Sequence, residues 1–143
     1  MIESSMMIND RMPEYTVERA SKILNRFKKA LNGSKILMLG VAYKQDIDDY
    51  RESPALNVIE ILEKQGAVVT YHDPWVAEYQ HKGKVVKSEK ELSASLLEEA
   101  DLVIITTAHS NVDYDLVQKH AKAIFDTKNV MKAIADRDNI EVL

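Results

Sequence analysis

The chain has 143 residues, a formal net charge of −4 at pH 7 and no cysteine. This length suits one domain, and the charge gives no overall attraction to nucleic acid or anionic lipid. The lack of thiols excludes disulfide bonds, thiolate metal sites and a cysteine nucleophile within the chain. No segment reaches the roughly 18 apolar residues of a membrane span, and the first residues lack a secretion signal. We therefore expect a soluble cytoplasmic domain.

The first predicted element is a helix over residues 13–31. Apolar residues recur at helical spacing from Val17 to Leu31, and Asn32-Gly33 is a typical stop signal. Pro13 suits the first turn of a helix, but it also fits a kink inside a longer helix. The methionine-rich segment before Pro13 keeps this second possibility open.

Predicted strands and helices then alternate with short connections. Apolar runs typical of strands buried on both faces fall at 35–41, 67–71, 102–107, 123–126 and 140–143. Helical patterns lie between them at 53–65, 92–100 and 115–122, and the polar stretch 81–90 carries no predicted element. This alternation predicts a Rossmann-like α/β fold, with a parallel sheet covered by helices on both faces and preceded by one N-terminal helix.

The segment KILMLGVAYKQDIDDYRESP carries the first candidate site. It runs from a predicted strand through one glycine into a charged loop, and then to Ser53, a good helix cap. The next helix would point its positive N-terminus at this loop, which favours an anion. Lys44 and Arg51 could hold a phosphate there, with Tyr43 as a neighbouring aromatic face. In an ordinary solvated loop, however, both cations would pair with the loop's own carboxylates.

Three more candidates follow later predicted strands. Lys128 could reach the ligand of Lys44, because parallel strands end at one edge, although a lysine in such a turn is usually just exposed. Asp73 stands where a dinucleotide fold holds a ribose diol, but without Gly-x-Gly-x-x-Gly a structural turn with Pro74 is favoured. His109 is favoured as a plain loop histidine. The four histidines show no metal-ligand spacing, so no metal site is predicted.

Four motifs, in this order along the chain, resemble the C-terminal domain of the UDP-glucose/GDP-mannose dehydrogenase family: KILMLGVAYKQDIDDYRESPAL, GAVVTYHDPWV, EEADLVIITTAH and IFDTKN. A fifth segment, INDRMPEYTVERASKILN, resembles the end of that family's long central helix. The likeness covers nearly the whole chain. It is strongest to the branch that oxidises UDP-N-acetylglucosamine or UDP-N-acetylmannosamine.

The resemblance implies a division of the chain and a role for it. Full-length members have an N-terminal NAD-binding domain, a helical linker that builds a homodimer, and a C-terminal Rossmann-like domain that holds the UDP half of the substrate. Their catalytic cysteine and two hydride transfers to NAD turn the C6 alcohol of a UDP-sugar into a carboxylate. By this resemblance, residues 1–33 are the end of the linker helix and 34–143 are the UDP-sugar-binding domain.

The resemblance also assigns roles to four residues. Tyr43 and Lys44 fall where the family contacts the nucleotide and phosphates of the substrate, and Arg51 falls where an arginine reaches NAD held by the other domain. Lys128 falls where members commonly carry an arginine that binds the substrate. Lysine keeps the charge at this position but lacks the planar fork of arginine.

The family's glycine-rich NAD loop and catalytic cysteine are both missing from this sequence. We therefore expect a truncated piece that binds a UDP-sugar but has no catalytic residue, and whose partners are the other domains of the enzyme rather than nucleic acid or a membrane. One alternative is a free-standing regulator that binds NAD or CoA, which the lone Gly40 disfavours. Another is a dimerisation module built on the 13–31 helix.

Overall fold

The computed structural model describes residues 2–41, 53–81, 83–89, 91–107, 109, 112–135 and 138–142. A five-stranded sheet forms its centre, and its neighbouring strands are parallel. In spatial order, the strands are β2 (Val68–His72), β1 (Lys35–Leu39), β5 (Leu102–Ile105), β6 (Ile124–Asp126) and β7 (Ile140–Val142). The predicted Rossmann-like α/β class is confirmed.

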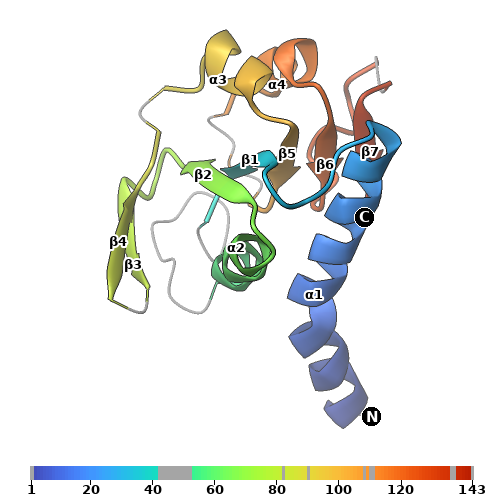
Figure 1. The fold of residues 1–143 in the computed structure, drawn as a ribbon, viewed down its shortest axis with the longest axis vertical. Coiled ribbons are helices and arrows are strands. Elements are labelled where there is room, and N and C mark those ends of the chain that lie inside the picture. Colours follow the sequence, from blue (N-terminus) through green and yellow to red (C-terminus); the bar gives the residue numbers. More distant parts are fainter. Residues whose placement is uncertain are drawn as a thin grey trace.

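Helices cover both faces of this sheet (Figure 1). The elements are α1 (Ile2–Arg26), α2 (Pro54–Lys64), α3 (Ala94–Glu99) and α4 (Tyr114–His120). Side chains of β1 alternate between the two covered faces, as the strand pleat requires. Ile36 and Met38 pack in the cluster with α1 and α2, whereas Leu37 and Leu39 pack in the cluster with α3 and α4. Because β1 is an apolar run that is buried on both faces, its sequence pattern alone predicted a strand.

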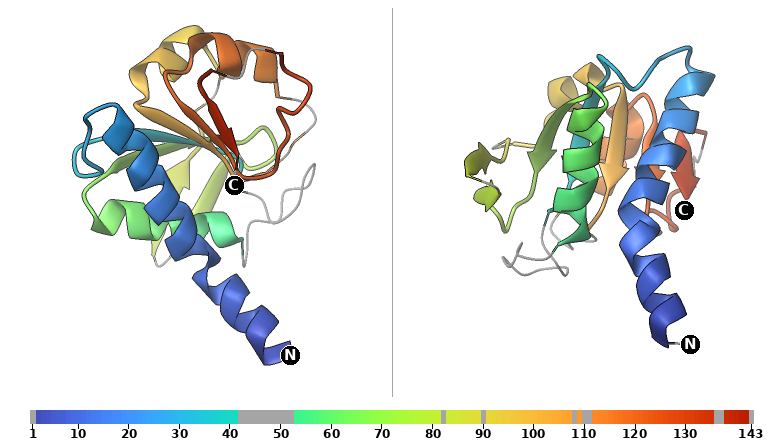
Figure 2. Two further views of the ribbon diagram at one scale, coloured as in Figure 1. Left: turned by 90° about the vertical axis from the view of Figure 1, so that its right-hand side faces the viewer. Right: turned by 60° about the horizontal axis from the view of Figure 1, so that its bottom comes forward.

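Helix α1 differs from the predicted 13–31 helix at both ends. It begins at Ile2 and contains Pro13 in its interior, so the longer-helix alternative is the one observed. Its first turns project beyond the rest of the domain (Figure 2). None of the helices among the described residues is both long enough and apolar enough to cross a membrane.

The predicted end of this helix at Leu31 is wrong, because the chain leaves the helix at Arg26. Lys28 adopts a left-handed conformation with φ 61°, and the Lys29 N–H donates to the Leu24 carbonyl at 3.0 Å. The Lys28 N–H donates to the Asn25 carbonyl at 3.0 Å, which completes a Schellman-type ending. Glycine usually holds the left-handed position, so a lysine there gives no stop signal in the sequence.

A β-hairpin that the sequence analysis missed occupies part of the polar stretch 81–90. Strands β3 (Glu78–His81) and β4 (Lys84–Lys87) pair antiparallel next to β2. Tyr79 anchors the hairpin, because its ring is buried and lies 5.1 Å from the ring of Tyr71. Burial also raises the pKa of the Tyr79 hydroxyl to about 12. Partly buried Val86 of β4 also packs against the same core. Two such contacts in an otherwise polar sequence explain why periodicity alone did not reveal these strands.

Helix α1 is joined to the last strand by ion pairs to Glu141. Arg19 Nη2 lies 3.2 Å from Glu141 Oε2, and Arg26 binds the other carboxylate oxygen. The Arg19 guanidinium also lies 5.4 Å from the centre of the Phe125 ring and donates to the Val142 carbonyl at 3.0 Å. Burial alone would raise the pKa of Glu141, but the hydrogen bonds from Arg26 and Arg19 outweigh it and lower that pKa.

We expect Glu141→Gln to lower the free energy of unfolding by about 1 kcal/mol at neutral pH, because the side chains are partly exposed and water screens their attraction. The folded-state pKa of Glu141 lies below its ordinary value of 4.5. Its contribution is therefore present above that value and is lost as the pH falls through the folded-state pKa. Urea unfolding at neutral pH and at about pH 3 measures both effects.

The loss of stability on acidification should be smaller in Glu141→Gln than in the unchanged protein. Glu18→Gln is the matched control, because Glu18 is exposed on the same helix as Arg19. An equal loss on acidification with and without Glu141 would show that the ion pairs contribute nothing to stability.

Candidate functional site

The strands of the sheet end in one row, which defines the carboxyl edge of the sheet. Leu39 of β1 is in register with His72 of β2 and with Ile105 of β5, and Ile105 is in register with Asp126 of β6. The residues that follow each strand therefore gather along this edge. These residues form a group that we name the carboxyl-edge cluster. It comprises Gly40, Val41, Asp73, the threonines after β5, His109 and the turn after Asp126.

The chain reverses direction across the sheet at β1. After β1 the chain crosses to β2 on one side, and then returns past β1 to β5 on the other side. In open α/β sheets such a reversal separates the loops and marks the place where ligands bind. The segments that follow β1 and β5 flank this switch point. The sequence analysis predicted a ligand at the end of β1 on the same principle.

Asp73 is saturated by hydrogen bonds from the protein. The residue is 2% exposed, and its Oδ1 accepts the N–H groups of Trp75 at 2.8 Å and Val76 at 3.1 Å. Its Oδ2 accepts the Val41 N–H at 2.8 Å and lies 3.0 Å from His109 Nε2. A carboxylate offers about four lone-pair positions, so Asp73 has none to give to a ribose diol. The structural role favoured from sequence is confirmed.

His109 lies in the segment after β5, far from Asp73 in sequence. Its ring is 1% exposed, and its backbone carbonyl accepts the Tyr114 hydroxyl at 2.8 Å. Histidine is not usually so fully buried unless its ring is paired. His109 lies in a loop, as expected, but its imidazole is buried inside the domain against Asp73.

Gly40 lets the segments after β1 and β5 approach each other closely. It adopts φ +93°, and a Cβ on Gly40 would lie 2.5 Å from the Thr107 Cβ. The Gly40 N–H donates to the His72 carbonyl at 3.0 Å, and the Thr106 hydroxyl donates to the Gly40 carbonyl. The single glycine of this segment is thus needed for close packing at the switch point.

Asp126 orders the turn that carries Lys128. Its side chain is fully buried, and its carboxylate accepts the backbone N–H groups of Lys128 at 3.1 Å, Val130 at 3.2 Å and Met131 at 2.8 Å. The side chain of Lys128 itself is exposed. Sequence reasoning singled out Lys128 and missed Asp126, although an aspartate that ends a predicted strand before a polar turn is a usable signal.

Tyr43, Lys44 and Arg51 lie outside the described residues. The described chain resumes at Ser53, whose buried hydroxyl accepts the Ala55 N–H at 3.3 Å and caps α2 as predicted. The positive end of α2 therefore lies at the point where the described chain resumes. Within the described part of the chain, no group of three or more histidine or acidic residues could hold a metal ion.

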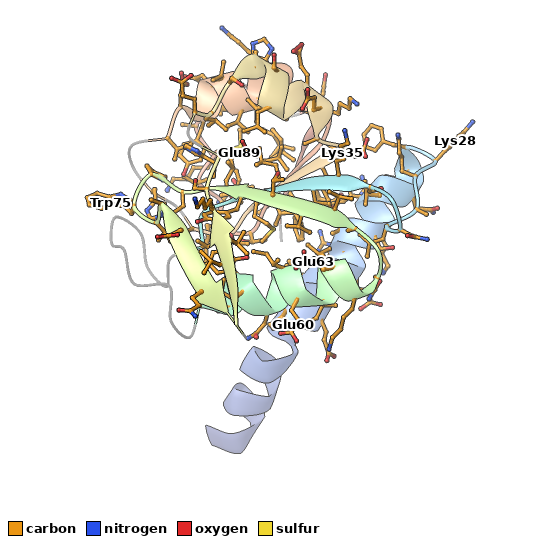
Figure 3. All side chains as sticks on the ribbon, turned by 60° about the vertical axis from the view of Figure 1, so that its left-hand side comes forward. Lys28, Lys35, Glu60, Glu63, Trp75 and Glu89 are labelled. Atoms are coloured by element: carbon orange, nitrogen blue, oxygen red, sulfur yellow. The ribbon has the colours of Figure 1, made fainter. Side chains whose placement is uncertain are left out.

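A groove of about 470 Å³ lies between the end of β2 and the β3–β4 hairpin. Its lining residues come from the ends of these strands and from the segments that follow β2 and β4: His72, Asp73, Pro74, Ala77, Glu78, Lys87, Ser88 and Glu89. Trp75 is 45% exposed and points away from the domain (Figure 3). Because the groove depends on the hairpin, the sequence analysis did not predict it, although it singled out Asp73 for another reason.

Comparison with known proteins gives a family match over residues 37–133, to the UDP-glucose/GDP-mannose dehydrogenase family, UDP binding domain. A UDP-N-acetyl-D-mannosamine dehydrogenase of Methanococcus maripaludis is 29% identical over 140 residues, which cover 92% of this chain and 30% of that protein.

Solved structures of nucleotide-sugar dehydrogenases also match this chain. A UDP-D-ManNAc dehydrogenase from Pyrococcus horikoshii matches with a TM-score of 0.75 and 27% identity, covering 95% of this chain and 31% of that one. A UDP-N-acetyl-mannosamine dehydrogenase from Staphylococcus aureus matches with a TM-score of 0.68 and 31% identity, covering 95% of this chain and 31% of that one. The chain thus spans about a third of the length of these relatives.

We expect Gly40→Ala to lower the free energy of unfolding by at least about 2 kcal/mol, because the new methyl group is strained at positive φ and also collides with Thr107. Gly33→Ala is the matched control. Gly33 has φ +86°, and no described atom lies within 4 Å of a Cβ placed there. The control should therefore lose only about 1 kcal/mol. Urea unfolding measures both, and equal losses would contradict the close contact at Thr107.

Proposed function

The chain belongs to the UDP-glucose/GDP-mannose dehydrogenase family, and we propose that it binds the UDP half of the substrate of an NAD-dependent nucleotide-sugar 6-dehydrogenase. The match of residues 37–133 to the family's UDP binding domain carries this proposal. The proposed substrate is a UDP-N-acetylhexosamine, because several relatives bear the name UDP-N-acetyl-D-mannosamine dehydrogenase. Oxidation of its C6 hydroxyl would give a uronic acid.

The order of the strands supports a nucleotide across the carboxyl edge. Lys44 follows β1 in the sequence and Lys128 follows β6, with β5 between these two strands. Neighbouring strands lie about 4.8 Å apart, so the ends of β1 and β6 are separated by about 10 Å. A nucleoside diphosphate can span this distance. Lys44 and the N-terminus of α2 would neutralise the phosphate charge, and Lys128 would contact the substrate from the end of β6.

Each proposed ligand residue has one role. Tyr43 and Lys44 bind the nucleotide and its phosphates, and Lys128 binds the substrate from the turn ordered by Asp126. Arg51 reaches towards NAD, which is held mainly by residues outside this chain. Residues 1–33 belong to a linker helix of the homodimeric enzyme, and 34–143 form the UDP-sugar-binding domain.

The same proposal implies that this chain has no catalytic activity on its own. The thiol that the family resemblance implies for catalysis is absent from the sequence. We infer that this chain binds without turnover. A separate NAD-binding regulator is disfavoured. The Asp73 carboxylate, the expected partner of a ribose, already accepts backbone N–H groups of neighbouring segments and pairs with His109.

Isothermal titration calorimetry should detect UDP binding to the 143-residue chain, and Lys44→Ala should abolish it because a charge-assisted contact to phosphate is lost. Lys64→Ala is the matched control, since Lys64 is 73% exposed near the other end of α2. The same protein supplied with NAD and a UDP-sugar should form no NADH. Unchanged UDP affinity in Lys44→Ala would refute the site, and no binding by the unchanged protein would refute the function.

Lys128→Arg should bind a UDP-sugar about threefold more tightly, because a guanidinium can form two parallel hydrogen bonds to a phosphate group. Lys128→Ala should bind about tenfold more weakly, through loss of the charge. Lys132→Ala is the control, because Lys132 is an exposed lysine just beyond the same turn. If all three variants bind the UDP-sugar as the unchanged protein does, Lys128 takes no part in the site.

A further inference from the structure

The buried pair of Asp73 and His109 joins three strand ends at the switch point. Asp73 follows β2 and His109 follows β5, and these two strands flank β1 on opposite sides. The carboxylate oxygen that meets His109 also accepts the N–H of Val41, the second residue after β1. A single oxygen atom therefore connects the segments that leave β1, β2 and β5.

We propose that Asp73 and His109 are positioning residues for nucleotide binding, which set the backbone path at Gly40 and Val41 without touching the ligand. This inference rests on the proposed function, since it concerns the same binding step. Both side chains are almost fully buried, so neither presents a polar group to a ligand at the surface. Their effect on binding would pass through the main chain that they hold.

The hydrogen-bond chemistry settles which atom donates. An ionised carboxylate only accepts hydrogen bonds, and Asp73 Oδ2 already accepts the Val41 N–H at 2.8 Å. His109 Nε2, at 3.0 Å from the same oxygen, must therefore carry a proton and donate it. The imidazole supplies a donor that this buried carboxylate needs, because a buried charge is stable only when it is paired or hydrogen-bonded.

The backbone at Gly40 and Val41 is held from several directions at once. The Gly40 N–H donates to His72, its carbonyl accepts the Thr106 hydroxyl, and the Val41 N–H donates to Asp73. Thr107 packs against the bare Cα of Gly40. Of these contacts, the one to Asp73 is the last along the described chain before residue 42. Its geometry therefore sets the direction in which the chain leaves the sheet.

Loss of the imidazole would disturb this arrangement at its buried centre. Without the donor, Asp73 Oδ2 would keep the Val41 N–H and lose a charge-assisted bond inside the domain. The carboxylate would then have to turn or recruit water, and Val41 would move with it. A shift of about 1 Å in a supporting group is enough to weaken a site strongly, because its ligand contacts depend on fixed geometry.

The experiment compares two replacements of His109 in the 143-residue chain. Leucine fills similar space but cannot donate, whereas glutamine places an amide N–H near the position of Nε2. His109→Leu should lower UDP affinity about tenfold in calorimetry, and His109→Gln should stay within about threefold of the unchanged protein. His120→Leu is the matched control, a histidine on α4 whose Nδ1 lies 3.9 Å from a Glu98 oxygen.

Each outcome bears on the inference. A residue with only a structural role would lower thermal stability but leave the UDP affinity of the folded protein unchanged. Equal UDP affinity in His109→Leu and the unchanged protein would thus overturn the inference and leave the proposed function intact. Failure of the unchanged protein to bind UDP would overturn both. Weaker binding in His109→Leu with rescue in His109→Gln would support the positioning role.

Two further measurements cover a variant that fails to fold. His109→Asn is polar but shorter, so its amide does not reach Asp73, and it should weaken UDP binding as leucine does. Amide hydrogen exchange, followed by NMR in the unchanged protein, tests the geometry without a substitution. The Val41 amide should exchange as slowly as that of Met38 in β1. Exchange of Val41 as fast as an exposed turn amide would overturn the inference.

Discussion

Buried aspartates that accept backbone N–H groups hold the carboxyl edge of this fold together. Asp73 follows β2 and Asp126 ends β6, and each carboxylate accepts N–H groups from the chain that comes next. A turn that leaves a buried sheet exposes several unpaired donors, and one carboxylate can satisfy three or more of them. The segments at this edge therefore leave their strands in fixed directions, which a binding site requires.

The same constraint explains how a loop with one glycine can serve a nucleotide. In a glycine-rich turn the bare backbone itself approaches the phosphates. The one glycine of this segment is used for packing, because Gly40 closes against Thr107. Under the proposed function, phosphate binding would then fall to positively charged side chains and to the N-terminus of α2.

The packing of β7 against α1 depends on ion pairs between segments that lie far apart in the sequence. Glu141 of β7 meets Arg19 and Arg26 of α1, more than a hundred residues earlier in the chain. Strand β7 has only three residues, so its pairing with β6 supplies few hydrogen bonds. The ion pairs tie this short strand to the helix. They also fix α1 against the sheet, while its first turns extend past the domain (Figure 2).

The sequence by itself determined the α/β class, the five strands of the sheet, the Ser53 cap and the family, because each depends on local pattern or on a motif. The end of α1 at Arg26 was missed for a local reason, because the left-handed Lys28 stands where glycine would have given the stop signal. Tertiary structure alone decided the β3–β4 hairpin and the pairing of His109 with Asp73. Tyr79 of the hairpin packs against Tyr71 of β2, and His109 lies 36 residues from Asp73, so the stabilising contacts come from residues that no local pattern connects.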